Sequence, residues 1–248
     1  MLKAAALIAL GLFSAGTALA EEGEIALLHA DTDIKNTESL QRGARDFMND
    51  CSGCHSLKYL RYNRLAQDLK IPESELAKNL IFTDAKAFEE ITTGMSAQSA
   101  DWFGKQPPDL TLMARERGVD YLYSYLHGFY ADKTRPWGVN NLYLPGTAMP
   151  HILYYRQGLQ KPEYKNDKDN DPKGNAKMVL AGVAPMIPGS MKPEEYDQYV
   201  RDTVNFLDYA AEPVKSTRES MGIFVVLFLL VLFVFSYLLK KEYWKDVH

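Results

Sequence analysis

The sequence predicts a mainly α-helical domain with long loops, followed by one C-terminal transmembrane helix. Three observations support this class. Residues 38–50 and 193–211 carry apolar side chains three or four positions apart, which is the spacing of one helix face. Residues 158–176 are polar, charged and rich in helix-breaking residues, as expected of a long surface loop. Residues 221–239 form an apolar run without any charge.

The N-terminus has the pattern of a secretory signal. Lys3 precedes a short apolar stretch, residues 4–13, and the sequence A-L-A at residues 18–20 comes before two glutamates. A positive start, an apolar core and an A-x-A site are typical of signals that are removed on export. We therefore expect residues 1–20 to be a signal peptide and the mature chain to begin at Glu21.

The apolar run near the C-terminus has the length and flanks of a membrane span. About 20 residues of helix cross the hydrocarbon core of a bilayer, and lysines and aromatic residues follow the run between residues 240 and 245. Such residues anchor a span at the membrane surface, and basic tails stay in the cytoplasm. We expect a periplasmic domain at 21–218, one transmembrane helix at 219–240 through the cell inner membrane, and a cytoplasmic tail at 241–248.

The chain is mildly acidic, with a formal net charge of −4. An acidic domain held at a membrane favours a basic, diffusible partner, because complementary potentials speed encounter. The same charge argues against nucleic acid as a partner. An ordinary solvated surface explains the charge equally well.

The two cysteines indicate the chemistry. Cys51 and Cys54 are followed directly by His55, which gives the sequence C-x-x-C-H. This is the attachment signature of c-type haem, because two thiols at this spacing reach the two vinyl groups of the porphyrin and the histidine lies under the iron. The motif predicts a cytochrome c-type haem domain with one covalent haem c and with His55 as an iron ligand.

Other uses of a cysteine pair fit less well. A thioredoxin-like dithiol would follow a strand in a βαβ unit, whereas residues 38–50 have helical periodicity. A structural zinc ion needs about four ligands, and the chain offers no second Cys/His pair at a suitable spacing. Haem attachment is therefore the favoured interpretation.

A haem that carries electrons needs a second axial ligand, and a methionine sulfur raises its potential. Among nine methionines, Met149 and Met186 lie in proline-rich segments without helical periodicity, where proline restricts the backbone. The residues alone leave these two as close competitors. His151, two positions after Met149, keeps a bis-histidine site open as an alternative.

Two further segments are expected near the haem. Residues 106–110 are predicted to form an extended rim, in which Pro108 is a candidate haem contact. A helix is expected from residue 110 to 126, with Arg115 near its start. The planar guanidinium of an arginine suits a haem propionate, although an exposed arginine on a helix is usually only solvated.

The last helix before the span is expected to cross the first one. Gly43 lies on the apolar stripe of residues 38–50 and would permit close approach of the two backbones. The side chains of the 193–211 helix predicted to face inward are Tyr196, Val200, Val204 and Leu207.

Several segments, which include the haem motif and extend well beyond it, narrow the choice among haem proteins. They are residues 51–59 with Arg61-Tyr62, Pro107-Pro108-Asp109-Leu110, Ala114-Arg115 with Asp120-Tyr121, residues 145–150, residues 202–207 and Ala211-Glu212-Pro213. On these segments, from about residue 36 to the C-terminus, the chain resembles cytochrome c1, the haem-c subunit of the proteobacterial ubiquinol:cytochrome c reductase (cytochrome bc1 complex).

The resemblance implies roles for single residues. Cys51 and Cys54 would be the thioether attachment points, and Arg115 would contact a haem propionate. His55 and Met149 would be the axial ligands, so that the resemblance decides between the two methionines. Relatives with an extra disulfide differ from this chain, which has no cysteine beyond the haem pair.

The resemblance also implies partners and a reaction. The haem would accept an electron from the Rieske iron–sulfur protein and pass it to a soluble cytochrome c or equivalent carrier, with cytochrome b completing the core of a dimeric complex in the membrane. The chain would act as a subunit of a proton-translocating ubiquinol:cytochrome c oxidoreductase and would itself only transfer electrons. A stand-alone tethered carrier, a terminal-oxidase subunit and a peroxidase are the other classes that a haem motif allows.

Overall fold

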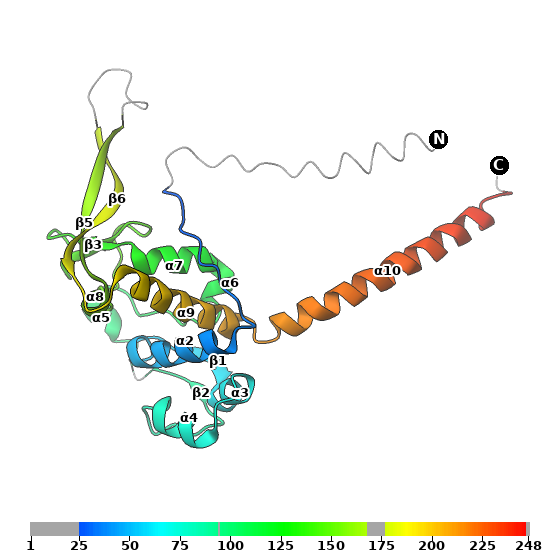
Figure 1. Cartoon of the computed structure of the whole chain (residues 1–248), viewed down its shortest axis with the longest axis horizontal. Helices are drawn as coiled ribbons and strands as arrows, with labels where there is room; N and C mark the ends of the chain where they lie inside the picture. Colours follow the sequence, from blue (N-terminus) through cyan, green and yellow to red (C-terminus); the bar gives the residue numbers. More distant parts are fainter. Residues whose placement is uncertain (1–24, 94, 168–176, 247–248) are drawn as a thin grey trace.

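The computed structural model describes residues 25–93, 95–167 and 177–246. The expected signal peptide lies outside these residues. The described part of the chain forms a domain of short and medium helices with three two-stranded sheets, and a long helix extends from it (Figure 1). Helices predominate and long connections separate them, so the predicted mainly α class is confirmed.

Short elements surround two longer helices that lie side by side. The helices are α2 (Thr37–Asp50), α3 (Tyr62–Asp68), α4 (Glu73–Asn79), α5 (Ser99–Phe103), α6 (Met113–Arg117), α7 (Val119–His127), α8 (Tyr154–Gln157), α9 (Pro193–Ala211) and α10 (Lys215–Tyr243). The strands pair as β1 (Leu57–Arg61) with β2 (Glu90–Ile91), β3 (Phe129–Ala131) with β4 (Val139–Asn141), and β5 (Gly158–Asp167) with β6 (Lys177–Pro188).

The centre of the domain is the contact between α2 and α9. Their apolar faces pack together, and the ring centroids of Phe47 and Phe206 are 5.7 Å apart. A Cβ atom on Gly43 would overlap the carbonyl oxygen of Asp202 and lie 2.7 Å from the Phe206 Cβ. The structure thus confirms the predicted close approach at Gly43. All four α9 side chains predicted to face inward are buried, namely Tyr196, Val200, Val204 and Leu207.

The helix predicted from residue 110 to 126 is divided in two, so that prediction was only partly right. Gly118, between α6 and α7, has φ 88° and ψ 152°. This backbone conformation is not helical, and glycine adopts it more readily than other residues do. Each of the two short helices packs against α9. Residues 106–110 belong to neither helix nor strand, as expected of an extended rim.

The prediction of a surface loop at residues 158–176 was wrong for its first part. β5 pairs antiparallel with β6, with Leu159 opposite Ile187 and Tyr164 opposite Leu180. The partner strand is rich in Val, Ile, Leu and Met, which favour strands. Pairing with it makes the polar segment β5 a strand as well. The hairpin projects from the domain (Figure 1). Residues 168–176 lie outside the described part of the chain.

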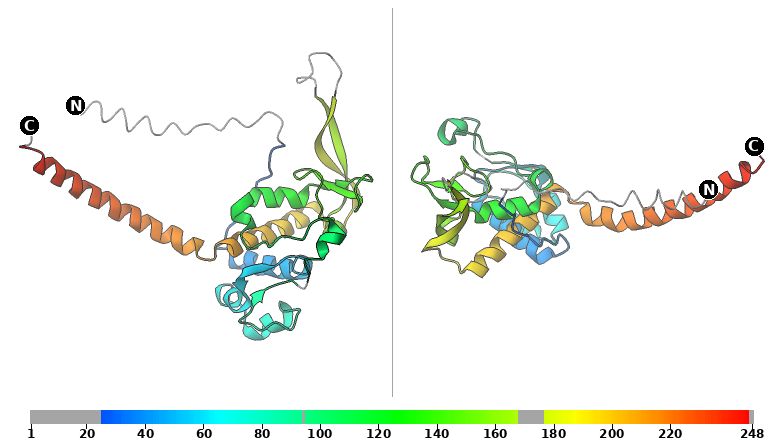
Figure 2. Two further views of the ribbon diagram at one scale, coloured as in Figure 1. Left: turned by 180° about the vertical axis from the view of Figure 1, so that it is seen from behind. Right: turned by 90° about the horizontal axis from the view of Figure 1, so that it is seen from above.

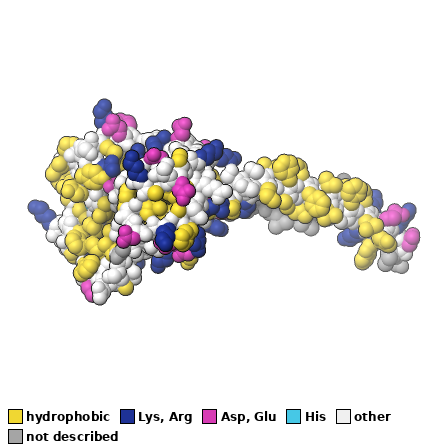
Figure 3. Space-filling model, turned by 90° about the horizontal axis from the view of Figure 1, so that it is seen from below, with side chains coloured by type: hydrophobic (Ala, Val, Ile, Leu, Met, Phe, Trp, Pro, Cys, Tyr) yellow, Lys and Arg dark blue, Asp and Glu magenta, His cyan; other side chains and the backbone are white. Residues whose placement is uncertain are grey.

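The long helix α10 contains the apolar run. By length and composition it could cross a membrane, and none of its residues is buried against the rest of the chain. It points away from the domain in both further views (Figure 2). Hydrophobic side chains cover it, with charged side chains near its far end (Figure 3). These features are those expected of a membrane anchor.

Candidate haem site

The two cysteines and His55 lie on one turn that extends α2. The Cys51 amide donates to the Phe47 carbonyl at 2.9 Å, as in a continuing helix. The amides of Cys54 and His55 then donate to the Cys51 carbonyl at 3.0 and 2.9 Å. Because this turn is closed by hydrogen bonds, Cys51, Cys54 and His55 are carried on one ordered segment of backbone. Neither cysteine forms a disulfide.

The surroundings of the two thiols differ from those of a catalytic redox pair. Burial raises the pKa of the Cys51 thiol to about 12 and also raises the pKa of Cys54. A catalytic dithiol needs a thiolate, and its surroundings lower the pKa of the attacking sulfur. The environment of Cys51 therefore disfavours dithiol exchange.

The imidazole of His55 is oriented by the rim. Its Nδ1 lies 2.8 Å from the Pro108 carbonyl oxygen. A carbonyl only accepts hydrogen bonds, so Nδ1 carries the proton and Nε2 keeps its lone pair. Burial lowers the pKa of His55, which favours the neutral ring. A neutral imidazole with one nitrogen tied to a carbonyl is the usual form of a metal-ligating histidine.

The rim is fastened to the chain that follows the motif. The Leu110 amide donates to the Ser56 carbonyl at 2.9 Å. The carboxylate of Asp109 accepts from the amides of Lys58 and Thr111, each at 2.9 Å. These bonds fix the Pro108 carbonyl beside His55. The haem contact of Pro108 stays a prediction, and in the structure its carbonyl oxygen orients the histidine.

Met149 lies in the loop between β4 and α8, and this loop is tied down before the methionine. The Thr147 hydroxyl is 2.8 Å from the Tyr125 hydroxyl, and the Gly146 amide donates to the Asn140 side chain at 2.8 Å. Met149 itself is partly buried. Its competitor Met186 lies on β6 and is 48% exposed, so that it belongs to a strand rather than to a proline-rich loop.

His151 is a packed histidine. It is 6% exposed, and its ring lies nearly parallel to that of Phe129 with the centroids 4.8 Å apart. Burial lowers its pKa to about 4. The stacking on Phe129 is typical of a core side chain, so the geometry does not favour the bis-histidine alternative.

Arg115 is exposed on α6. Within the described residues it makes no ion pair closer than 4.0 Å. Glu212, at the end of α9, has a lowered pKa, mainly because Arg218 donates to it and to a smaller extent because of the charge of Arg115. The helix that carries Arg115, α6, packs against α9. No described hydrogen bond joins Arg115, or Met149, to the His55 turn.

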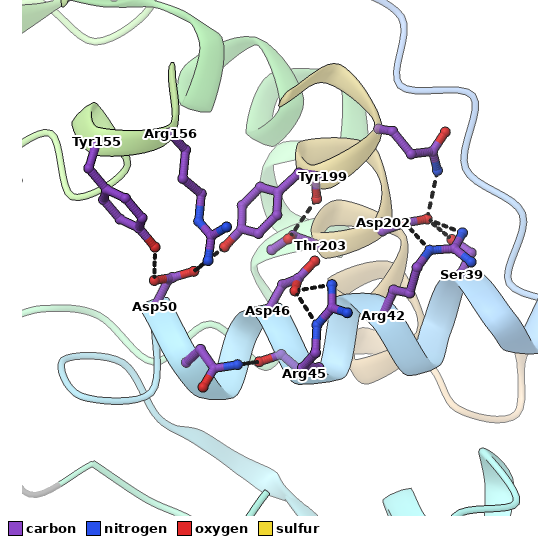
Figure 4. A network of polar contacts seen from close by, with 12 residues as sticks. Ser39, Arg42, Arg45, Asp46, Asp50, Tyr155, Arg156, Tyr199, Asp202 and Thr203 are labelled. Carbon is purple, nitrogen blue, oxygen red and sulfur yellow. Dashed lines mark hydrogen bonds and ion pairs between the residues drawn. The ribbon is translucent and has the colours of Figure 1, made fainter. Parts of the chain in front are cut away.

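Sequence reasoning missed a set of polar contacts next to the motif. The carboxylate of Asp50, the last residue of α2, accepts hydrogen bonds from Tyr155, Arg156 and Tyr199 (Figure 4). The donors are 105, 106 and 149 residues away along the chain. An aspartate directly before the cysteine motif was the single local signal, and it did not reveal these partners.

Comparison with known proteins shows the family of the chain. The family model described as "Cytochrome C1 family" matches residues 31–247. Cytochrome c1 of Allochromatium vinosum is 51% identical and covers 93% of each chain. The "Ammonia monooxygenase gamma subunit" of Nitrosomonas europaea is 40% identical over 91% of this chain and 90% of its own. "Cytochrome b/c1" of Bradyrhizobium diazoefficiens is 25% identical over 85% of this chain and 33% of its own. Because the family model matches most of the chain, the chain belongs to the cytochrome c1 family.

Proposed function

We propose that this chain is the membrane-anchored electron carrier of a cytochrome bc1 complex, where it takes electrons from the Rieske iron–sulfur protein and gives them to a soluble cytochrome c. The single observation that carries this is the closed turn in which two thiols stand beside a neutral His55 oriented by the Pro108 carbonyl. Together with family membership, it supports a haem c held for electron transfer.

The residues present fit haem c. Cys51 and Cys54 would hold it through thioethers, and the Nε2 atom of His55 would ligate the iron. Met149 would be the second iron ligand, since its loop is tied down and Met186 is on a strand. Arg115 would contact a propionate. When bound, the haem supplies a one-electron redox centre whose potential a methionine ligand raises.

The protein itself contributes position rather than bond-making. His55 is kept in one tautomer, and a closed pair of axial ligands would exclude oxygen and other small ligands from the iron. The chain alone would therefore only transfer electrons, and the oxidoreductase activity would belong to the assembled complex.

The anchor supports a place in the inner membrane. We place the haem domain in the periplasm and the tail after α10 in the cytoplasm, since Lys240 and Lys241 end the apolar helix. Cytochrome b is the expected partner in the membrane, within a dimeric complex. The name of the relative from Bradyrhizobium, cytochrome b/c1, supports this association.

A second candidate follows from one relative. The protein from Nitrosomonas europaea is named as a subunit of ammonia monooxygenase, so a role in an ammonia-oxidising complex is the alternative. Both candidates use the same haem site and differ in the proteins bound to it.

Purification of the tagged full chain in mild detergent separates the two. The bc1 assignment predicts that a b-type cytochrome and an iron–sulfur protein co-purify in constant ratio to haem c. A His55→Ala variant, which should lack the native haem spectrum, serves as the control for specific assembly. Isolation as a lone haem protein, or with an ammonia-oxidising enzyme, from cells that make the full set would overturn the bc1 assignment.

A further inference from the structure

Asp50 joins the haem-attachment turn to a distant part of the chain. It ends α2 and directly precedes Cys51. Its carboxylate accepts from the Tyr155 hydroxyl at 2.7 Å, from Arg156 Nη2 at 3.0 Å and from the Tyr199 hydroxyl (Figure 4). The side chains of Asp50 and Arg156 are 11% and 21% exposed. The ion pair is therefore largely shielded from solvent. The energy of a shielded ion pair depends more strongly on its geometry than that of a surface pair does.

Arg156 is held in place by more than its charge. Its guanidinium carbon lies 4.9 Å from the ring centroid of Tyr155 and 4.4 Å from that of Tyr199. Two aromatic faces and one carboxylate thus fix a single arginine. The backbone of α8 is fixed as well, since the Met191 amide donates to the Arg156 carbonyl at 3.1 Å. α8 therefore cannot shift without breaking these contacts.

A short and folded connection links α8 to Met149. α8 begins at Tyr154, and the intervening residues form tight turns. The Ile152 amide donates to the Pro150 carbonyl at 2.9 Å, and the Tyr154 amide donates to the His151 carbonyl at 3.2 Å. These turns constrain residues 150–154, so the position of α8 restricts where the adjacent Met149 can lie.

We propose that Asp50 and Arg156 are positioning residues that fix the Met149 side of the haem crevice relative to the His55 side. The inference rests on the proposed function, in which His55 and Met149 ligate the iron. Cys51 and His55 would hold the haem firmly on one side, whereas a neutral thioether binds only when its loop presents it. The contact of Asp50 with α8 supplies that constraint from the residue next to the attachment turn.

The test uses the full chain in its complex, with Asp50→Asn, Arg156→Gln and the double variant. Covalent haem is measured by haem staining after denaturation. Methionine ligation is measured by its near-infrared charge-transfer band in ferric protein and by carbon monoxide binding to ferrous protein. We expect unchanged covalent haem, a weakened or lost band, carbon monoxide binding increased several-fold and a lower midpoint potential. The double variant should lose no more than the more severe single variant, because the two residues act as one pair.

The matched control is Arg42→Gln. Arg42 is also on α2, and its Nε pairs with Asp202 of α9 at 2.6 Å without touching α8 (Figure 4). This variant should keep the band and exclude carbon monoxide. If Asp50→Asn accumulates poorly, Tyr155→Phe removes one donor without burying a charge and should weaken the band in part.

Two results would overturn the inference. The first is that Asp50→Asn keeps the wild-type band and does not bind carbon monoxide. If Asp50→Asn does not accumulate, the same result in Tyr155→Phe counts instead. The other is an equal loss in Arg42→Gln, which would show a general effect on packing. The ligand assignment is judged separately, by whether Met149→Leu abolishes the band in an otherwise wild-type chain.

Discussion

At His55, one hydrogen bond decides which ring nitrogen is available to iron. The Pro108 carbonyl can only accept, so the proton is on Nδ1 and the lone pair is on Nε2. The C-x-x-C-H motif predicted His55 as a ligand, and the expected rim at residues 106–110 made Pro108 a candidate haem contact. The motif could not predict that a backbone oxygen 53 residues away orients the ring, because a local pattern contains no long-range contacts.

Met149 is the residue whose role can be tested most simply. The axial ligands of a haem set its potential within a range of roughly 0.8 V. Met149→Leu should lower the midpoint potential by a substantial part of this range, and it should open the iron to carbon monoxide. Met186→Leu is the matched control, since Met186 is half exposed on β6. Redox titration with optical detection measures both. The reverse pattern, with Met186→Leu changing the potential and Met149→Leu silent, would show that Met186 is the ligand.

His127 should make the stability of the domain depend on pH. Burial lowers its pKa, the Tyr123 carbonyl and Asp197 oppose this shift, and Arg201 adds to it. Since the folded pKa is below the unfolded value of 6.5, the unfolded chain binds the extra proton. Stability should be full above pH 6.5 and fall as pH drops towards the folded pKa. Thermal loss of the haem spectrum measures it, and His127→Gln should reduce the dependence; an unchanged slope would count against His127.

At the level of elements, the long helices were predictable and the pairings were not. Residues 193–211 carry an uninterrupted helical pattern, and α9 has those bounds. β5 was missed because its residues are polar, and only pairing with β6 makes it a strand. The break at Gly118 depends on one backbone conformation that apolar spacing does not reveal. The Asp50 contacts were missed for a similar reason, because their donors lie on α8 and α9.

The packing of α2 on α9 leaves no room at Gly43. Gly43→Ala should lower the free energy of unfolding by about 1–3 kcal/mol, the usual cost of overpacking, because the new methyl group would overlap the backbone of Asp202. Gly222→Ala is the control, since it lies on α10 with nothing within 4 Å of its added Cβ. Thermal unfolding of the haem domain in detergent compares them. Equal stability of both variants would contradict the described crossing.

At the level of the whole molecule, the haem domain and the anchor are joined by charged contacts. Lys215 Nζ lies 2.9 Å from the Asp208 carboxylate, and Arg218 Nε lies 2.6 Å from that of Glu212. Both pairs link the start of α10 to the end of α9 or the residue after it. They would hold the domain close to the membrane surface, where a membrane-bound donor can reach it.

The proposed orientation predicts which end of the chain is open to attack from outside. Protease added to spheroplasts should digest the haem domain, whereas a tag after His248 should survive until the membrane is broken. Immunoblots against the tag and haem staining follow the two ends. Loss of the tag in intact spheroplasts, with the haem domain protected, would reverse the orientation.

In the proposed function, electrons pass from quinol through an iron–sulfur protein to this chain and then to a soluble carrier. The most direct measurement is rapid-mixing optical spectroscopy of haem c in the purified complex, with and without its iron–sulfur subunit. We predict that quinol reduces haem c quickly only when that subunit is present, and that added oxidised cytochrome c then reoxidises it. Equally fast reduction without the iron–sulfur subunit, or no reduction with it, would contradict the claim.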